Sequence, residues 1–264
     1  MTSIKHVEHG AATIGYRDEG QGPALVLIHG TGGDGEANWG GVVEHLPGRR
    51  IIRPDYAGSG LTSDPATRLT LDHVADQVLA AVDHAGVDTF DLAGFSLGAA
   101  VAIRIAARHP GRINRLVSLG GFASGGDPRS VMMFDHWIEL AQRDPGILAR
   151  LMLLTGFSPD FVAGMGDLDA AVVTMVDTMN WSGVALQAEL DKAIDITADL
   201  EAVSAPTLVL GNRRDQMVAP SASIALANGI AGARLDWIDG PHLSPMEMPE
   251  AVAAALTGFL ADTP

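Results

Sequence analysis

Short, mostly apolar runs recur along the chain and predict buried β-strands. Five such runs span residues 24–28, 90–93, 116–119, 207–210 and 235–238, each followed within two residues by a glycine or an acidic residue. Runs of this length without polar alternation are typical of strands buried on both faces of a parallel sheet. An earlier segment, Ile4 to Arg17, instead predicts an antiparallel pair that turns near His9 and Gly10.

Helical patterns lie between these runs. Residues 71–85 place Val74, Val78 and Val82 on one face, and residues 97–109 are apolar almost all round until Pro110 ends the pattern. Strands that alternate with helices favour an α/β fold with a mostly parallel sheet.

The alternation stops between residues 123 and 202. This region has helical patterns but no convincing strand, and Asp127-Pro128, Asp144-Pro145 and Ser158-Pro159 mark helix starts or turns within it. The strand–helix rhythm resumes at Ala205-Pro206. We therefore expect segments 1–122 and 203–264 to form one α/β core, and residues 123–202 to be a helical cap inserted over the sheet.

Composition narrows the functional classes. The 264 residues are 47% hydrophobic, which suffices for one large core. A formal net charge of −15 opposes binding to nucleic acids and to anionic membrane surfaces. The chain has no cysteine, which excludes a thiolate nucleophile and cysteine-ligated metal sites. With no apolar signal region and no run long enough to span a bilayer, we expect a cytoplasmic protein that acts on a small molecule.

The strongest chemical signal is Gly94-Phe95-Ser96-Leu97-Gly98. It fits G-x-S-x-G, follows a predicted strand and opens a predicted helix, which is the context of a nucleophilic serine on a sharp strand-to-helix turn. Glycines are needed on both sides because side chains there would collide with the neighbouring strand and helix. Ser96 is therefore the candidate nucleophile; the alternative is an ordinary turn with a capping serine.

A serine hydroxyl needs a base, and the base needs a carboxylate to fix its tautomer. Among the nine histidines, His242 is the candidate base because it follows the last predicted strand in a Gly-Pro-His loop. Asp215 follows the strand at 207–210 and is the candidate acid. Asp239 is its rival, although a residue three positions from His242 seldom points back at the ring.

The loop His29-Gly30-Thr31-Gly32-Gly33 follows the first buried strand, and its glycines let the backbone approach a substrate closely. We expect the N–H of Thr31, or alternatively that of Gly32, to act with the N–H of Leu97 as an oxyanion hole. Each such donor contributes roughly 3 kcal/mol to transition-state stabilisation. A phosphate-binding loop is disfavoured because G-x-x-x-x-G-K-[ST] is absent. We expect His29 itself to be structural.

Together these motifs resemble the α/β-hydrolase superfamily. The resemblance rests on His29-Gly30, on Asp55-Tyr56-Ala57-Gly58-Ser59-Gly60, and on Ser96, Asp215 and His242 in the family's chain order. It implies the α/β-hydrolase fold, with helices on both faces of the sheet and a helical cap after the sixth strand. It also implies an esterase-like or lipase-like serine hydrolase with a catalytic triad that needs no metal or organic cofactor.

Family members that dehalogenate or open epoxides place Asp where this chain has Ser96, so the resemblance disfavours those activities. We expect hydrolysis of a moderately hydrophobic ester, lactone or thioester through an acyl-enzyme on Ser96. Acyl transfer, carbon–carbon bond hydrolysis and cofactor-free perhydrolysis on the same triad remain alternatives. A non-hydrolytic, receptor-like binding protein of the same fold is another.

Six of the ten methionines lie in the expected cap, together with Trp137 and Trp181. They are Met132, Met133, Met152, Met165, Met175 and Met179. Methionine conforms to irregular apolar shapes, so a cavity lined by it would accept a bulky lipophilic acyl group. The alternative is that these side chains only pack the cap helices onto the core.

Overall fold

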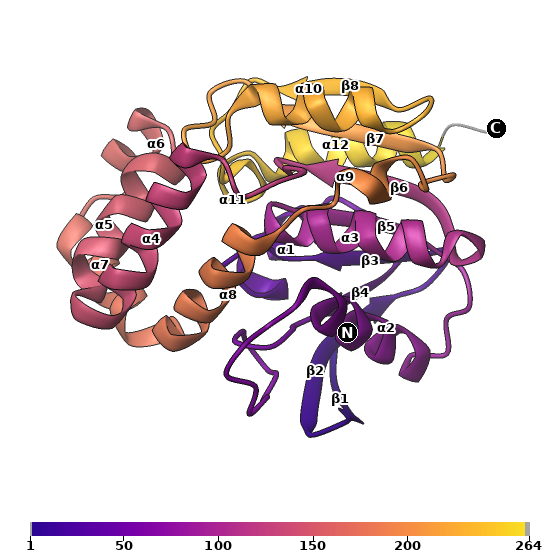
Figure 1. Ribbon diagram of the computed structural model, residues 1–264, viewed down its shortest axis with the longest axis horizontal. Helices are drawn as coiled ribbons and strands as arrows, with labels where there is room; N and C mark the ends of the chain where they lie inside the picture. The colour runs from indigo at the N-terminus through magenta and orange to yellow at the C-terminus, as the bar shows by residue number, and fades with distance from the viewer. Residues whose placement is uncertain (1, 262–264) are drawn as a thin grey trace.

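The computed structural model describes residues 2–261 and contains one eight-stranded sheet (Figure 1). The strands are β1 Ser3–His9, β2 Ala12–Gly20, β3 Ala24–Ile28, β4 Arg50–Pro54, β5 Phe90–Phe95, β6 Ile113–Leu119, β7 Thr207–Asn212 and β8 Arg234–Ile238. Their order in the sheet is β1-β2-β4-β3-β5-β6-β7-β8. β2 pairs antiparallel with β1 and β4, and β3 to β8 pair parallel. The mostly parallel sheet is therefore confirmed.

All five apolar runs form strands, and the antiparallel pair turns at Gly10 as predicted. Strand β4 was not predicted, because its short apolar centre is flanked by Arg50 and Arg53. Those arginines are accommodated by ion pairs with Asp18 and Glu19 of the neighbouring strand β2. Burial of β8 on both faces was a wrong expectation: β8 is the edge strand, and its residues 234–236 are exposed.

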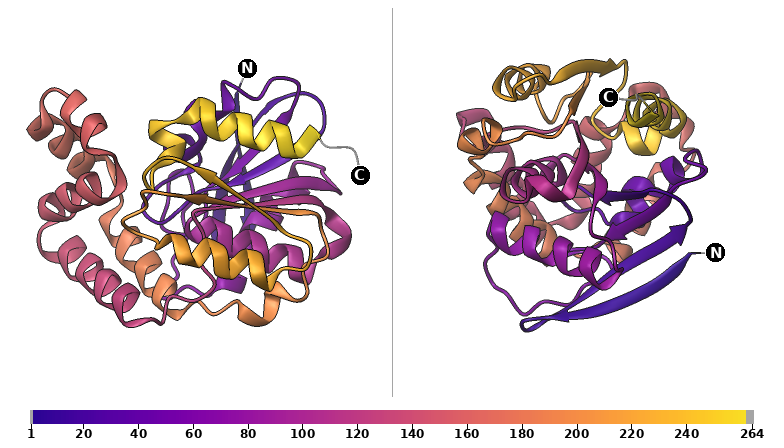
Figure 2. Two further views of the ribbon diagram at one scale, coloured as in Figure 1. Left: turned by 90° about the horizontal axis from the view of Figure 1, so that it is seen from above. Right: turned by 90° about the vertical axis from the view of Figure 1, so that its right-hand side faces the viewer.

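Helices cover both faces of the sheet, as predicted (Figure 2). The core helices are α1 Gly35–Val43, α2 Leu71–His84, α3 Leu97–Arg108, α10 Pro220–Gly229, the short α11 Ser244–Glu247 and α12 Pro249–Ala261. Successive side chains of β3 point to opposite faces. Leu25 and Leu27 pack with residues of α1 and α12, while Val26 and Ile28 pack with residues of α2, α3 and α10.

Residues 120–206, between β6 and β7, form the helical insertion and contain no strand. Its helices are α4 Pro128–Arg143, α5 Pro145–Gly156, α6 Pro159–Gly164, α7 Leu168–Thr178, α8 Trp181–Ala193 and α9 Thr197–Leu200. Asp127, Asp144 and Ser158 cap three of them through side-chain oxygens, each followed by a proline at the first helical position. The three proline dipeptides seen in the sequence therefore mark helix starts.

The insertion stands beside one edge of the core, with α4 to α7 projecting from it and α8 returning across it (Figure 1). This is the edge where β5, β7 and β8 end and lead into the loops that carry the candidate chemistry. Within residues 2–261, no helix combines the length and the apolar character needed to cross a bilayer.

Candidate active site

Ser96 occupies a constrained turn between β5 and α3. Its φ of 55° makes it the single non-glycine residue with positive φ in residues 2–261, a conformation that costs about 1 to 3 kcal/mol for a residue with a Cβ. An added Cβ at Gly94 would lie 2.0 Å from the Gly98 carbonyl oxygen, and one at Gly98 would lie 2.4 Å from the Ile28 oxygen. The predicted collisions at both glycines therefore occur, and the turn holds the serine hydroxyl clear of the sheet.

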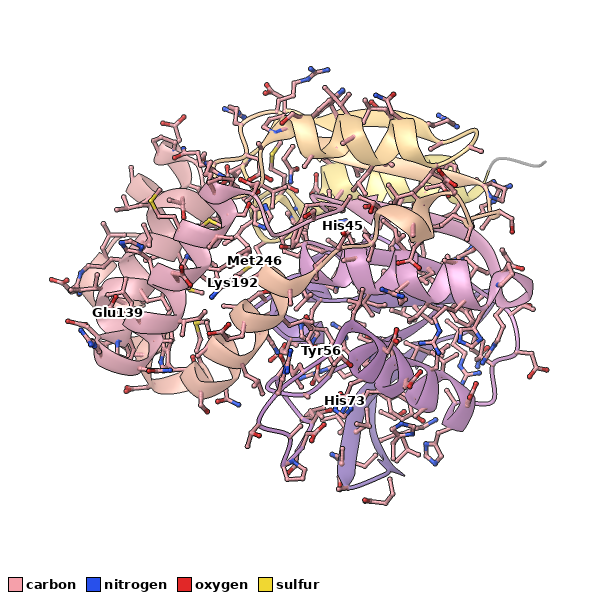
Figure 3. The ribbon with its side chains drawn as sticks, in the orientation of Figure 1. His45, Tyr56, His73, Glu139, Lys192 and Met246 are labelled. Atoms are coloured by element: carbon pink, nitrogen blue, oxygen red, sulfur yellow. The ribbon has the colours of Figure 1, made fainter. Side chains whose placement is uncertain are left out.

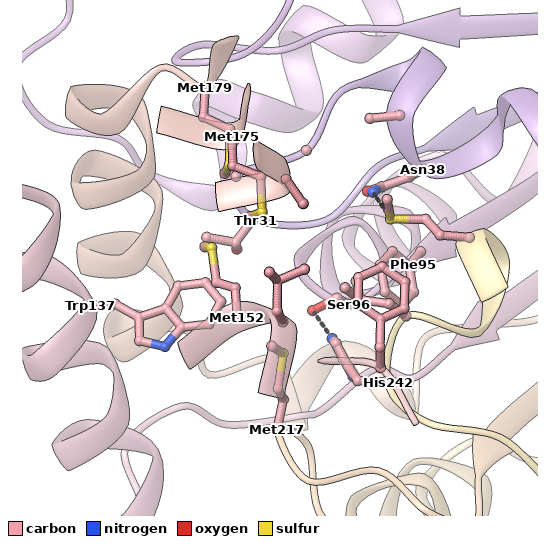
Figure 4. Close-up of a pocket in the computed structure, with 18 of the residues that line it drawn as sticks. Thr31, Asn38, Phe95, Ser96, Trp137, Met152, Met175, Met179, Met217 and His242 are labelled. Carbon is pink, nitrogen blue, oxygen red and sulfur yellow. Dashed lines mark hydrogen bonds between the residues drawn. The ribbon is translucent and has the colours of Figure 1, made fainter. Parts of the chain in front are cut away.

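A continuous hydrogen-bond chain joins Asp215, His242 and Ser96. The Ser96 hydroxyl lies 3.2 Å from Nε2 of His242 (Figure 4), and Nδ1 of the same ring lies 2.7 Å from Oδ2 of Asp215. A carboxylate can only accept here, so Nδ1 carries the proton and Nε2 is left to accept from the hydroxyl. Asp215 is itself fixed, because its Oδ1 accepts the N–H groups of Met217 and Val218 at 2.9 and 2.8 Å.

The rival carboxylate Asp239 points elsewhere. It forms an ion pair with Arg214 at 3.4 Å, and both side chains are mostly exposed. The geometry thus brings Asp215, and not Asp239, to His242.

His29 has the structural role that the sequence predicted. Its Nδ1 donates to the Gly30 carbonyl at 2.9 Å, and its ring stacks on Tyr56 with centroids 3.9 Å apart. The Tyr56 hydroxyl donates to the His29 carbonyl oxygen. Complete burial lowers the pKa of His29, so this ring stays neutral and braces the loop that follows β3.

The structure distinguishes the two candidate donors of the glycine-rich loop. The Gly32 N–H already donates to Oε1 of Gln187 at 2.9 Å. The Gly30 and Gly33 N–H groups are also engaged, by Asn38 Oδ1 and the Gly30 carbonyl. Within residues 2–261 the Thr31 N–H has no such acceptor, which leaves it as the loop's available donor.

The second expected donor is the N–H of Leu97. Leu97 is the first residue of α3, so its N–H has no acceptor within the helix. The Leu97 N–H, directly after Ser96, and the Thr31 N–H are therefore the two expected donors that have no acceptor within residues 2–261.

Two side chains of α8 reach this loop, and sequence reasoning missed both. The Thr31 hydroxyl donates to Oδ2 of Asp191 at 2.5 Å, and Gln187 accepts the Gly32 N–H. Asp191 is 1% exposed, and burial raises its pKa to about 8, against the opposing effect of the Thr31 hydrogen bond. Its carboxyl group is therefore mainly protonated at neutral pH. The signal that could have found them is two polar residues one turn apart on a helix face that is otherwise apolar.

Ser96 opens into a cavity of about 480 Å³ between the sheet edge and the insertion (Figure 4). Seven methionines line it: Met133, Met152, Met165, Met175, Met179, Met217 and Met246. The aromatic lining residues are Phe95, Phe134, Trp137 and Phe157. Five of the six expected cap methionines thus line the cavity, whereas Met132 is 61% exposed on the outer surface.

The lining of the cavity carries no charged residue, and His242 is its one titratable side chain. Thr174 and Thr178 also line it, but their hydroxyls donate back to carbonyl oxygens of α7. In residues 2–261 no cluster of three or more histidine, aspartate or glutamate side chains is arranged to hold a metal ion.

The fold and this arrangement define a hydrolase of the α/β type, and the comparisons with known proteins agree. Residues 23–249 match the family model described as alpha/beta hydrolase fold, so the chain belongs to that family.

Among its curated relatives is a pyrrolizixenacetamide deacetylase of Xenorhabdus hominickii, 43% identical over 97% of this chain and 98% of that protein. A 2-hydroxymuconate semialdehyde hydrolase of Pseudomonas sp. strain CF600 is 28% identical over 93% and 89% of the two chains. Among solved structures, the enol-lactonase of Burkholderia xenovorans LB400 superimposes with a TM-score of 0.89 at 25% identity, covering 98% of this chain and 100% of that one.

Proposed function

We propose that the protein is a serine hydrolase that cleaves an uncharged, largely apolar acyl compound through an acyl-enzyme on Ser96. The observation that carries this proposal is the hydrogen-bond chain from Asp215 through His242 to Ser96, which ends in an apolar cavity of about 480 Å³. Each side chain comes from a loop that follows a different parallel strand, at the sheet edge where ligands bind in such folds.

The reaction has two halves. His242 Nε2 takes the proton of the Ser96 hydroxyl as Oγ attacks the carbonyl carbon, and the oxyanion accepts hydrogen bonds from the N–H groups of Thr31 and Leu97. His242 then donates the proton to the departing alcohol, thiol or amine. Water attacks the acyl-enzyme in the second half, with His242 again as base, and the acid leaves. Asp215 stabilises the imidazolium in both halves.

The cavity lining indicates the substrate class. A carboxylate or phosphate held among methionine and aromatic side chains would lose its hydration without gaining a charged partner, which is costly. Uncharged esters, lactones and thioesters therefore fit. The deacetylase at 43% identity adds a second candidate, an acetamide of a bulky apolar amine, because amide cleavage uses the same steps.

We also propose that residues 123–202 act as the cap that selects the substrate. Lining residues of the cavity come from α4, α5 and α7 of the insertion, including Trp137, Met152 and Met175. The core contributes the polar lining residues Ser96 and His242 on the opposite side (Figure 4).

The proposed function is tested with the purified protein, a fluorophosphonate probe and a panel of esters, amides, lactones and thioesters. We expect the probe to label Ser96 and neutral substrates to exceed matched carboxylate-bearing ones by at least about tenfold in kcat/KM. Added alcohols separate hydrolysis from acyl transfer through the products formed. A protein that the probe does not label and that turns over no acyl compound would be a binding protein instead.

Truncating side chains that line the cavity is expected to change the substrate length at which kcat/KM is highest. Met152→Ala or Trp137→Ala enlarges the cavity, so longer substrates should gain, each newly buried methylene contributing about 0.8 kcal/mol or roughly fourfold in kcat/KM. The measurement is kcat/KM across a homologous ester series, varied first in the acyl group and then in the alcohol. Met132→Ala is the matched control because Met132 lies outside the cavity. An unchanged profile in both cavity variants would make the insertion a passive cover.

A further inference from the structure

The loop that carries Thr31 is held from two sides of the molecule. On the core side, Asn38 of α1 accepts the Gly30 N–H at 2.9 Å. On the insertion side, Gln187 of α8 accepts the Gly32 N–H at 2.9 Å, and Asp191 accepts the Thr31 hydroxyl at 2.5 Å. These anchors are on different elements, and one of those elements lies in the insertion.

The two anchored N–H groups, those of Gly30 and Gly32, lie on either side of the Thr31 N–H, which is the group proposed to bind the oxyanion. Each peptide unit is planar, so neighbouring units turn relative to one another only through φ and ψ of the residue between them. Asn38 fixes the unit that ends in the Gly30 N–H, and Gln187 fixes the unit that ends in the Gly32 N–H. The unit between them carries the Thr31 N–H. Its own carbonyl oxygen, that of Gly30, accepts from His29 Nδ1 and from the Gly33 N–H, so these contacts and the anchors at both ends together determine its direction.

One face of α8 makes the insertion-side hydrogen bonds to this loop. Gly183, Gln187 and Asp191 are spaced four residues apart and therefore lie along one side of the helix. An added Cβ at Gly183 would lie 2.0 Å from the Gly58 carbonyl oxygen, so the helix approaches the loop after β4 as closely as a glycine allows.

Both ends of the Gln187 amide form hydrogen bonds at this contact. Its Nε2 donates to the Ala57 carbonyl oxygen at 2.9 Å and to the Ser59 hydroxyl at 2.7 Å, while Oε1 serves Gly32. The side chain is completely buried. Gln187 therefore connects the loop that carries Thr31, the loop after β4 and the insertion through hydrogen bonds.

We propose that Gln187 and Asp191 are positioning residues, which hold the Thr31 N–H in the direction needed to bind the oxyanion. The proposal rests on the proposed serine hydrolase function. It makes the docking of α8 a condition for full kcat and not only for substrate choice. Because burial raises the pKa of Asp191 to about 8, this anchor places little negative charge beside the developing oxyanion at neutral pH.

The opposite side of α8 provides the control. Lys192, labelled in Figure 3, pairs there with Asp135 of α4 and with Glu189. Glu189 is exposed and, in the described residues, has no contact with the loop that carries Thr31. Glu189→Ala therefore alters the same helix without touching the anchors.

The experiment compares Gln187→Met and Asp191→Leu with Glu189→Ala. The first two substitutions keep the approximate size of the side chain but remove the oxygen that accepts a hydrogen bond from the loop. We expect kcat per active site, titrated with the fluorophosphonate probe, to fall roughly 10- to 100-fold in the first two while KM stays within about threefold. Affinity for a trifluoromethyl ketone, whose adduct places an oxyanion in the site, should fall by a similar factor. Asp191→Asn keeps an acceptor for the Thr31 hydroxyl and should restore most of kcat.

If the α8 variants do not fold, Thr31→Val and Thr31→Ser examine the same bond from the loop side. Valine removes the hydroxyl and should lower kcat, and serine, which keeps the hydroxyl, should have a kcat roughly tenfold or more above that of valine. Unchanged kcat per active site in Gln187→Met, Asp191→Leu or Thr31→Val would overturn the positioning role while the hydrolase function stands. A parent protein without Ser96-dependent hydrolysis would overturn both proposals. Equal losses in Asp191→Asn and Asp191→Leu would assign Asp191 a packing role alone.

Discussion

Ser96→Ala is expected to lower kcat by more than about a thousandfold, to the residual level that substrate binding and the oxyanion donors alone provide. The reason is that its hydroxyl meets one polar partner, Nε2 of His242, and contributes little else to packing. The variant should also lose labelling by the fluorophosphonate probe. The measurements are kcat on the best substrate of the panel, and mass spectrometry of the labelled protein.

A second substitution separates chemistry from stability at the same position. Alanine keeps the Cβ at the positive φ of 55°, so Ser96→Ala should melt close to the parent. Ser96→Gly removes the Cβ and should be the more stable of the two variants by about 1 kcal/mol, with equally little activity. Retention of more than a few per cent of parental kcat in either variant would remove Ser96 from the role of nucleophile.

Asp215→Asn is expected to lower kcat at neutral pH by about a thousandfold or more, and the surrounding hydrogen bonds explain why. Oδ1 of Asp215 accepts the N–H groups of Met217 and Val218. The asparagine oxygen must take over those two bonds, so its amino group faces His242. Nδ1 then has to accept, the proton moves to Nε2, and the imidazole can no longer accept the proton of Ser96.

The matched control for this prediction is Asp239→Asn. Asp239 pairs with Arg214 at the surface, so its substitution should leave kcat within about twofold of the parent, as is usual for exposed positions. Steady-state kinetics of the two variants at one neutral pH decides between the carboxylates. A large loss in Asp239→Asn with little loss in Asp215→Asn would reverse the assignment.

Local sequence predicted the parts of the molecule in which one segment determines its own structure. The apolar runs identified β3 and β5 to β7, since a strand buried on both faces is apolar at most of its positions. Ser96 was identified by the strand before it, the helix after it and the glycines around it. The proline dipeptides at 127–128, 144–145 and 158–159 marked helix starts because capping and a fixed φ act within a few residues.

The parts that sequence reasoning missed depend on partners far away in the chain. Arg50 and Arg53 are tolerated in β4 because carboxylates of β2 lie beside them, and β8 is exposed because no further strand follows it in the sheet. Gln187 and Asp191 look like ordinary polar residues of a helix until the fold brings α8 against the Thr31 loop, some 155 residues earlier in the chain. Local patterns carry no information about such pairings.

The contact between α8 and the two core loops also limits how this protein can be recombined with its relatives. An insertion exchanged as a whole would bring its own residues to the positions of Gly183, Gln187 and Asp191. A larger residue at 183 would meet the Gly58 carbonyl oxygen, and different side chains at 187 and 191 would leave the Gly32 N–H and the Thr31 hydroxyl without acceptors. A chimera that keeps full activity would therefore have to take this helix and both loops from the same parent protein.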